Sequence, residues 1–161
     1  FDEGPIIFKE KIKIYDHENI HDIQKKLSLI FSNFINNLNL KKIKYAKKIK
    51  TSRNISFLKR DENSGLVILK KHNVFSFCNF VRAQTDPYPS AYILYKKIKL
   101  KIVEAHIFIE KEKHLIRKNL KYYIFNDKTF IFKLKNQYVY VKKHKINKKY
   151  LQNEIFDKIF V

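Results

Sequence analysis

Several residue types are scarce or missing in this sequence of 161 residues. It has no methionine, no tryptophan, one cysteine, two glycines and three prolines. The single Cys78 excludes a disulfide within the chain and a metal site built from several cysteines, and it fits a reducing cytoplasm. Lysines interrupt every apolar run well before the roughly 20 residues of a membrane span. We therefore expect a soluble, cytoplasmic protein without a membrane span.

The start of the sequence lacks the features of a natural N-terminus. Phe1 stands where an initiator methionine would stand, and Asp2 follows at once. No charged segment precedes an apolar one, so we do not expect a signal peptide. We expect the chain to be a fragment of a longer protein.

Acidic residues are few, because 35 Lys and Arg stand against 15 Asp and Glu and give a formal net charge of +20. Such a field concentrates polyanions, including nucleic acids, nucleotide-linked substrates and polyglutamylated cofactors. The alternative is that an AT-rich coding sequence produced the excess of lysine, since lysines spread over a surface usually form a solvated face. The sequence leaves both origins open.

The residues that are present predict a globular α/β chain. Residues 5–14 begin with an apolar run and end in alternation, which predicts a strand that reaches an exposed edge. Asp16 to Asn19 supply turn and cap residues, and a helix of about five turns follows from Ile20. Its apolar positions are 20, 23, 27, 30, 31, 34, 35 and 38.

The middle of the chain predicts a connector between two domains. Residues 39–54 are rich in Lys and Arg and have only scattered apolar positions. We assign residues 1–45 to the end of one domain, 46–70 to a basic connector and 71–161 to a second domain. A turn is expected at 61–65, and the spacing of apolar residues predicts a helix from Val74 that ends before Pro87.

Alternating apolar positions between Tyr92 and Val141 predict short antiparallel strands. Residues 98–102, 105–109, 130–134 and 138–141 alternate, and residues 126–128 and 135–137 lie where hairpin turns would form. The second domain is therefore expected to be a small, mainly antiparallel β sheet or a partly open barrel.

Three segments carry a resemblance to a known family. They are Phe1-Asp2-Glu3-Gly4-Pro5-Ile6-Ile7, Phe57-Leu58-Lys59-Arg60-Asp61-Glu62-Asn63-Ser64-Gly65, and Phe80-Val81-Arg82-Ala83-Gln84-Thr85-Asp86-Pro87-Tyr88-Pro89-Ser90-Ala91. In this order they resemble landmarks of the 10-formyltetrahydrofolate-dependent formyltransferases, where the first ends the folate-binding loop and the last opens the C-terminal domain. The resemblance covers essentially the whole chain.

Some positions depart from the family pattern. Leu66 stands where a tryptophan is usual, Ser90 replaces a glycine, and Tyr88 stands where the methionyl-tRNA formyltransferases tend to have tryptophan. The last departure favours the branch that formylates amino sugars on nucleotide or lipid carriers. The resemblance implies that residues 1–45 end a Rossmann-like catalytic domain, with a strand and a long helix.

The resemblance implies a formyl transfer in which a neutral amine attacks the formyl carbon and an asparagine stabilises the oxyanion. A histidine manages the protons, and a neighbouring carboxylate raises its pKa. Asp2 matches that carboxylate, and the implied Asn and His belong to a motif upstream of Phe1. Phe1 and Asp2 would contact 10-formyltetrahydrofolate, and Asp2 has the alternative of a simple turn residue.

Two further residues are candidates for binding the substrate. Arg82 could reach an anionic group, although an arginine at a helix end commonly holds carbonyls or a carboxylate in place. Tyr88 could stack on a sugar or a base, or pack beneath its loop. The amine acceptor is expected to be an amino sugar on a nucleotide or lipid carrier, and charged initiator tRNA is the alternative.

A hypothesis of another class is that the chain is a noncatalytic module. Its terminal sheet could bind RNA through lysines and the tyrosines at 122, 123, 138 and 140, or it could mediate a homodimer.

Two signals of other chemistry are set aside. His17-Glu18-Asn19-Ile20-His21 matches a zinc-protease pattern, but it straddles the expected helix start, with Asn19 as the cap. We therefore expect no metal. Cys78, on the apolar face of its helix, is expected to be a small core residue and not a nucleophile.

Overall fold

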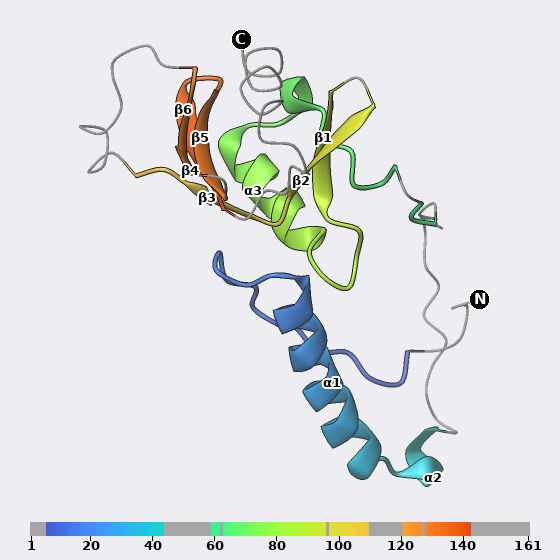
Figure 1. The fold of residues 1–161 in the computed structure, drawn as a ribbon. Helices are drawn as coiled ribbons and strands as arrows, with labels where there is room; N and C mark the ends of the chain where they lie inside the picture. Colours follow the sequence, from blue (N-terminus) through green and yellow to red (C-terminus); the bar gives the residue numbers. More distant parts are fainter. Residues whose placement is uncertain are drawn as a thin grey trace.

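The computed structural model describes residues 6–43, 59–61, 63–95, 97–109, 121–126 and 128–142. These residues combine helices with antiparallel sheets, which confirms the predicted mixture of helix and antiparallel sheet at this coarse level (Figure 1).

The predicted long helix is confirmed as α1, Ile20–Asn36. Asn19 caps it, because its side-chain oxygen accepts hydrogen bonds from the backbone N–H groups of His21 and Asp22. In turn, the Asp22 carboxylate accepts a hydrogen bond from the Asn19 N–H. This reciprocal capping box satisfies donors that a helix start leaves without partners. A short helix, α2, spans Leu40–Ile43.

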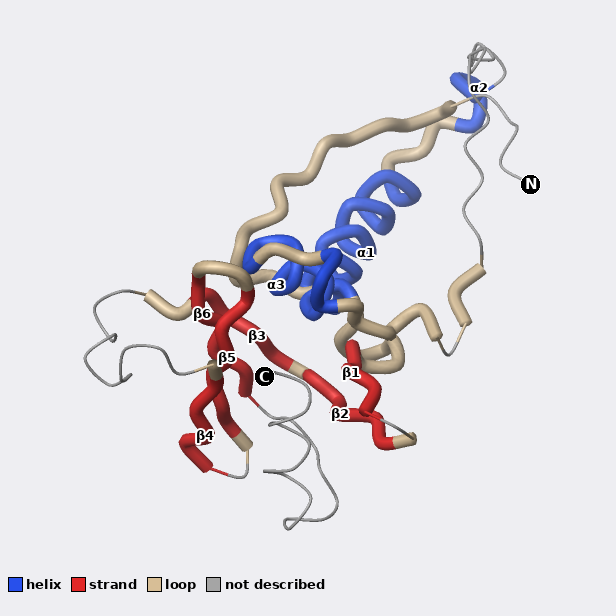
Figure 2. Tube along the Cα trace, turned by 90° about the horizontal axis from the view of Figure 1, so that it is seen from above, coloured by secondary structure: helices blue, strands red, loops and turns tan. Residues whose placement is uncertain are grey.

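The prediction of a strand over residues 5–14 is wrong, because residues 6–14 form no strand. They are largely exposed and run beside α1 in Figure 2. A strand needs a neighbouring strand for its N–H and C=O groups, and the described residues place none beside this segment. The apolar composition of the run suits a strand, but composition alone does not provide the neighbouring backbone that a strand requires.

The second predicted helix is confirmed as α3, Val74–Ala83, after a 3₁₀ turn, η1, at Leu69–Lys71. Asn73 caps α3 through the N–H of Ser76, and the Ser76 hydroxyl oxygen accepts from the Asn73 N–H. The helix ends before Pro87, as expected, with Gln84 as its C-cap.

The strands form two antiparallel sheets. The two-stranded sheet consists of β1, Ala91–Tyr95, and β2, Ile98–Ile102. The four-stranded sheet has the order β3-β6-β5-β4, with bounds Glu104–Ile107, Gln137–Lys142, Thr129–Leu134 and Tyr122–Asn126. Val103 is the single residue between β2 and β3, so one length of chain passes from the first sheet into the second, as Figure 2 shows.

The predicted hairpin turn at 135–137 is confirmed between β5 and β6. Leu134 pairs with Gln137, which leaves Lys135 and Asn136 as the loop. Lys135 has a φ of 57°, in the left-handed region that tight hairpin turns use.

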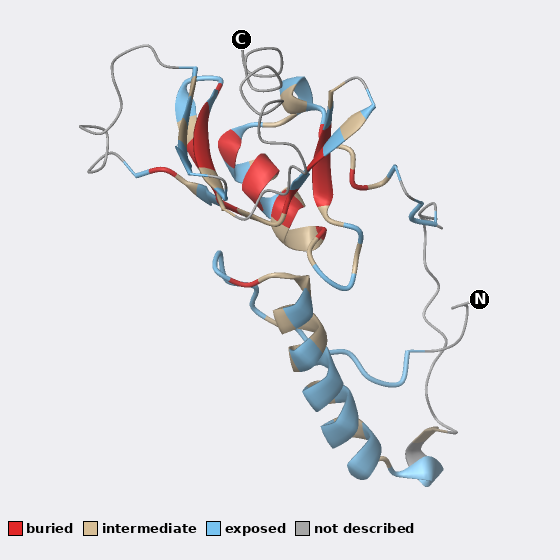
Figure 3. Cartoon of the chain, in the orientation of Figure 1, coloured by how far each residue is buried: buried red, intermediate tan, exposed pale blue. Residues whose placement is uncertain are grey.

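The core lies around α3, which sits between the two sheets in Figures 1 and 3. The ring of Phe77 meets the ring of Phe132 edge to face, with centroids 5.4 Å apart. Each such fully buried side chain contributes about 1.5 to 3 kcal/mol. The fully buried large side chains of this core come from α3 and from β2, β5 and β6: Phe77, Phe130, Phe132, Leu100, Ile102, Val74, Val81, Val139 and Val141. Ile131 is also fully buried, but in a second cluster with Phe108 on the other face of the four-stranded sheet.

The connector predicted for residues 46–70 lies largely outside the described residues. At its end, Val67 is buried in the core around α3, and its N–H donates to the Tyr92 carbonyl. The domain boundaries as a whole stay a prediction. No helix in the described part of the chain is long and apolar enough to cross a membrane.

Candidate functional site

Arg82, in the last turn of α3, joins this helix to the loop before α1. One guanidinium nitrogen, Nη1, donates to the carbonyl oxygens of Tyr15 and Glu18, each at 2.7 Å. The other, Nη2, donates to Asn79 Oδ1 at 2.6 Å. The Asp16 carboxylate lies 4.0 Å away and is fully exposed. These contacts match the second role that the sequence allowed for Arg82, which is to hold carbonyl groups in place. Substrate binding by Arg82 stays a prediction.

The loop that Arg82 holds is closed by Glu18. The Tyr15 N–H donates to Glu18 Oε2 at 2.8 Å, and the Lys26 ammonium from α1 forms an ion pair with Glu18 Oε1. Glu18 is only 8% exposed. The hydrogen bond from Lys26 and that from the Tyr15 N–H lower the pKa of the Glu18 carboxyl below its ordinary value of 4.5. This carboxylate is therefore an ionised structural group at neutral pH.

A second contact brings the turn at 59–65 against the segment that follows α3. The Arg60 guanidinium lies over the Tyr88 ring, 4.5 Å from its centroid, and its Nη1 donates to the Ala83 carbonyl at 3.5 Å. Gln84, a buried polar residue, donates through Nε2 to the Ser64 carbonyl at 3.1 Å. The segment around Arg60 and Ser64 therefore contacts the segment around Gln84 and Tyr88, about 20 residues further along the chain.

The predicted turn at 61–65 is tied by its own side chains. Asp61 accepts from the Ser64 hydroxyl and from the Asn63 N–H, both at 2.9 Å. The hydrogen bond from Ser64 is the main reason that the pKa of the Asp61 carboxyl is lowered. The turn places Gly65 beside β1, where the Tyr92 N–H donates to the Gly65 carbonyl at 2.8 Å.

Tyr88 lies in the loop between α3 and β1 and is half-buried. Its N–H donates to the Thr85 carbonyl at 3.0 Å, and the preceding Asp86–Pro87 peptide bond is cis. Arg60 covers one face of the ring. Tyr88 is therefore positioned both by its own loop and by the turn before β1, and its role in binding a substrate stays a prediction.

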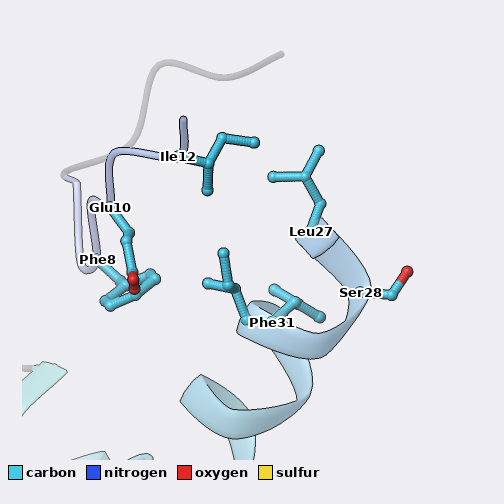
Figure 4. A pocket seen from close by; sticks show the side chains of 7 residues that line it. Phe8, Glu10, Ile12, Leu27, Ser28 and Phe31 are labelled. Carbon is cyan, nitrogen blue, oxygen red and sulfur yellow. The ribbon is translucent and has the colours of Figure 1, made fainter. Parts of the chain in front are cut away.

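A separate hollow of about 460 Å³ lies between the extended segment 6–12 and α1. Figure 4 shows Ile12 and Leu27 projecting into the space between the two, with Phe8 on one side. The Phe8 ring stacks on Phe34 with centroids 4.6 Å apart. The walls of the hollow are mainly apolar, and Phe31 at its rim is 62% exposed. The hollow offers packing surface and lacks the titratable pairs that chemistry needs.

The zinc-protease pattern does not form on one helix. Asn19 is the cap and α1 starts at Ile20, as predicted, so His17 lies in the preceding turn. Glu18 is held by Lys26 and Tyr15. No group of three metal-binding side chains occurs among the described residues.

Cys78 is buried on the core face of α3, as the sequence predicted. Burial raises the pKa of its thiol to about 11, which is far from the range of a reactive thiolate.

Sequence reasoning missed the residues that position this site. Glu18, Arg60 and Gln84 were not candidates, because their roles depend on partners that are distant in the chain. The buried glutamate had one local signal, its place just before a helix cap. Phe1 and Asp2, the predicted folate and catalytic residues, lie outside the described residues.

Comparison of the chain with protein-family models and with curated proteins gave no match.

Proposed function

We propose that this chain supplies the C-terminal part of an enzyme that transfers a formyl group from 10-formyltetrahydrofolate to the amine of an amino sugar on a nucleotide or lipid carrier. The observation that carries the proposal is the meeting of two of the three motif segments. Arg60 stacks on Tyr88, and Gln84 binds the Ser64 carbonyl. Two segments that the resemblance links only by their order in the sequence therefore contact each other in the folded chain, which supports the proposal.

The exposed apolar surface around α1 supports a finer proposal on the fold, that residues 1–45 are the C-terminal end of a Rossmann-like domain. Ile6, Ile7 and Phe8 are 46%, 50% and 44% exposed. Apolar side chains exposed together in this way are typical of a face that another part of a protein covers. In this proposal the remainder of the Rossmann-like domain covers them.

In the proposed reaction the amine nitrogen forms a bond to the formyl carbon, and the bond from that carbon to the folate nitrogen breaks. The amine proton passes to a histidine and on to the leaving nitrogen. By resemblance, Asp2 beside that histidine favours its protonated form, and Phe1 lies against the pterin. The asparagine and the histidine belong upstream of Phe1 in this proposal.

For the acceptor, we propose that the Arg60–Tyr88 pair contacts the nucleotide-linked sugar. The guanidinium offers donors that suit a phosphate, and the tyrosine offers a flat apolar face that suits a sugar ring. Arg82 then acts indirectly, because its donors already bind the loop before α1. Charged initiator tRNA is the second candidate acceptor, and the net charge of +20 favours it.

The test is a formylation assay on the intact natural protein that contains this sequence. With 10-formyltetrahydrofolate as donor, we expect formylation of a nucleotide-linked amino sugar and none of charged initiator tRNA. Formylation of the tRNA alone would reverse the choice of acceptor. If neither acceptor is formylated although the protein is folded and binds folate, the proposed activity is wrong.

A further inference from the structure

The four-stranded sheet has a second face that points away from α3. Alternation along β6 places Val139 and Val141 in the core, so Tyr140 and Lys142 lie on the opposite face. The register puts His106 and Ile131 on either side of Tyr140. This face is called the outer face of the sheet.

Aromatic rings gather on the outer face. Phe125 of β4 reaches across β5 to Tyr140 of β6, with ring centroids 5.6 Å apart. Tyr123 meets Phe125 edge to face at 5.0 Å. Tyr123 and Phe125 are 42% and 37% exposed, so the cluster presents ring surface to solvent. Exposed, mutually braced aromatic rings on a sheet form a platform on which another flat ring can stack.

A hollow of about 470 Å³ opens beside this platform. It is lined by His106, Ile107, Phe108, Ile109, Phe125, Tyr140 and Lys142. Its volume is within the roughly 300 to 1,000 Å³ of small-ligand sites, and its walls combine apolar rings with a cation. A planar, partly polar ring fits this lining.

The charges at the outer face are mostly positive. The Lys142 ammonium lies over the Tyr140 ring, 5.8 Å from its centroid, and Lys133 projects on the same face of β5. Among the described residues of β3 to β6 and their turns, Glu104 is the acidic one, and it is hydrogen-bonded to His106. Rings flanked by lysines complement a chain of flat bases joined by phosphates.

We propose that the outer face of the β3-β6-β5-β4 sheet binds single-stranded RNA. One unpaired base stacks on the exposed ring of Phe125, against which the Tyr140 ring packs at an interplanar angle of 55°, and enters the hollow beside it, while Lys142 and Lys133 bind the flanking phosphates. His106 at the wall of the hollow provides a polar group for a ribose hydroxyl. The site is separate from the contacts of Arg60 and Arg82, so it does not depend on formyl transfer.

The test measures binding of the 161-residue chain to a fluorescein-labelled oligouridylate of about 12 nucleotides by anisotropy. The Phe125→Ala and Tyr140→Ala variants should each bind about 5- to 100-fold more weakly, the range expected for loss of one stacking contact. Phe75→Ala is the matched control, since Phe75 is a 60% exposed ring on α3. It should bind like the unchanged chain. Tyr140→Phe keeps the ring and should also bind normally.

Competitors separate stacking from charge. Inorganic polyphosphate and duplex RNA of the same length should displace the oligomer poorly, because neither offers an unpaired base. Equal competition by polyphosphate, or an unchanged affinity in folded Phe125→Ala and Tyr140→Ala variants, would overturn the proposal in favour of a merely electrostatic surface. Equal binding of the matching DNA oligomer would overturn the assignment to RNA. Melting curves identify variants that fail to fold, and Phe125→Leu then tests the same contact with an apolar side chain kept.

Discussion

A Cβ atom at position 65 would lie 2.9 Å from the Ser90 carbonyl oxygen and 3.2 Å from that of Pro89. Both neighbours are backbone atoms, and the Gly65 carbonyl is itself bonded to the Tyr92 N–H. The turn before β1 therefore needs glycine for close approach of two backbone segments. The same approach sets Arg60 against Tyr88, so a local steric requirement determines the shape of the candidate site.

We expect Gly65→Ala to destabilise the chain by about 1 to 3 kcal/mol, the usual range for overpacking. Urea unfolding measures the change. Lys59→Ala, just before the same turn, is the control and should have little effect, because Lys59 is exposed. An unchanged midpoint for Gly65→Ala would show that the two segments separate easily.

Glu18 makes stability depend on pH in a defined direction. Its pKa is lowered in the folded chain, so its ionised form binds Lys26 and the Tyr15 N–H more favourably than its protonated form does. The stabilisation is present above its ordinary pKa of 4.5 and is lost as the pH falls through the lower, folded-state value.

Glu18→Gln should accordingly lower the melting temperature at pH 7, and the difference from the unchanged chain should shrink steadily as the pH falls below 4.5. Thermal melts of both proteins across this range measure the difference. Glu10→Gln is the control, because Glu10 is exposed on the extended segment. A difference that stays constant as the pH falls below 4.5 would mean that packing, and not the charge of Glu18, is responsible.

Asp2 gives the sharpest test of the proposed chemistry in the intact natural protein. Asp2→Asn keeps the shape but removes the charge that favours imidazolium, so turnover should fall by roughly two to four orders of magnitude. Folate affinity should change less than the rate. Single-turnover formylation and thermal melting on one preparation decide the matter. Near-normal turnover would reduce Asp2 to a turn residue, and failure to fold would make its role structural.

At the scale of elements, Arg82 connects two parts that are distant in the chain. It reaches 67 residues back from α3 to the Tyr15 carbonyl. The loop that it binds is the cap region of α1, where Glu18 and Asn19 already satisfy the local N–H groups. The guanidinium thus fixes the start of α1 against the end of α3, with only 19% of its side chain exposed.

Arg82→Lys should loosen this junction, because an ammonium cannot reach both carbonyls and Asn79 in the planar geometry of a guanidinium. We expect a loss of about 1.5 to 3 kcal/mol, the range for bonds to a charged group. Hydrogen exchange at residues 15–22 should become faster while exchange in β5 and β6 changes less. Arg60→Lys is the matched control, since its bond to the Ala83 carbonyl is longer, at 3.5 Å. Equal exchange in both variants would contradict a special role for Arg82.

At the scale of the whole molecule, burial is uneven. Figure 3 shows buried residues concentrated on α3 and the sheets, whereas most of α1 is exposed. Leu27, Phe31 and Ile35 lie on one face of α1 at a spacing of four residues and are 49%, 62% and 47% exposed. Contiguous apolar surface of this kind is typical of a face that another structure covers.

The chain by itself should therefore bind a hydrophobic dye such as anilinonaphthalene sulfonate through this face. The double change Leu27→Lys and Phe31→Lys should remove most of the dye fluorescence and alter stability by no more than about 0.5 kcal/mol, because both side chains are exposed. Phe75→Lys, an exposed ring on α3, is the control and should keep the fluorescence. Dye binding that survives the double change would place the apolar surface elsewhere.

The sequence by itself determined the elements whose signals are local. Asn19 marked the start of α1 because a cap needs only the next three residues, and the spacing of apolar residues marked the helix from Val74. Alternation in 130–134 and 138–141 determined β5 and β6, since burial of one face imposes a period of two. The turn at 61–65 and the buried Cys78 followed from equally short-range patterns.

Only the tertiary structure decided what depends on a distant partner. The run at 6–14 had the composition of a strand, yet pairing requires a neighbouring backbone that composition does not report. Arg82, Arg60 and Gln84 acquired their roles from carbonyls and a ring in other segments. A hydrogen bond is specified by where its acceptor lies, and the folded chain, not the order of residues, sets that position.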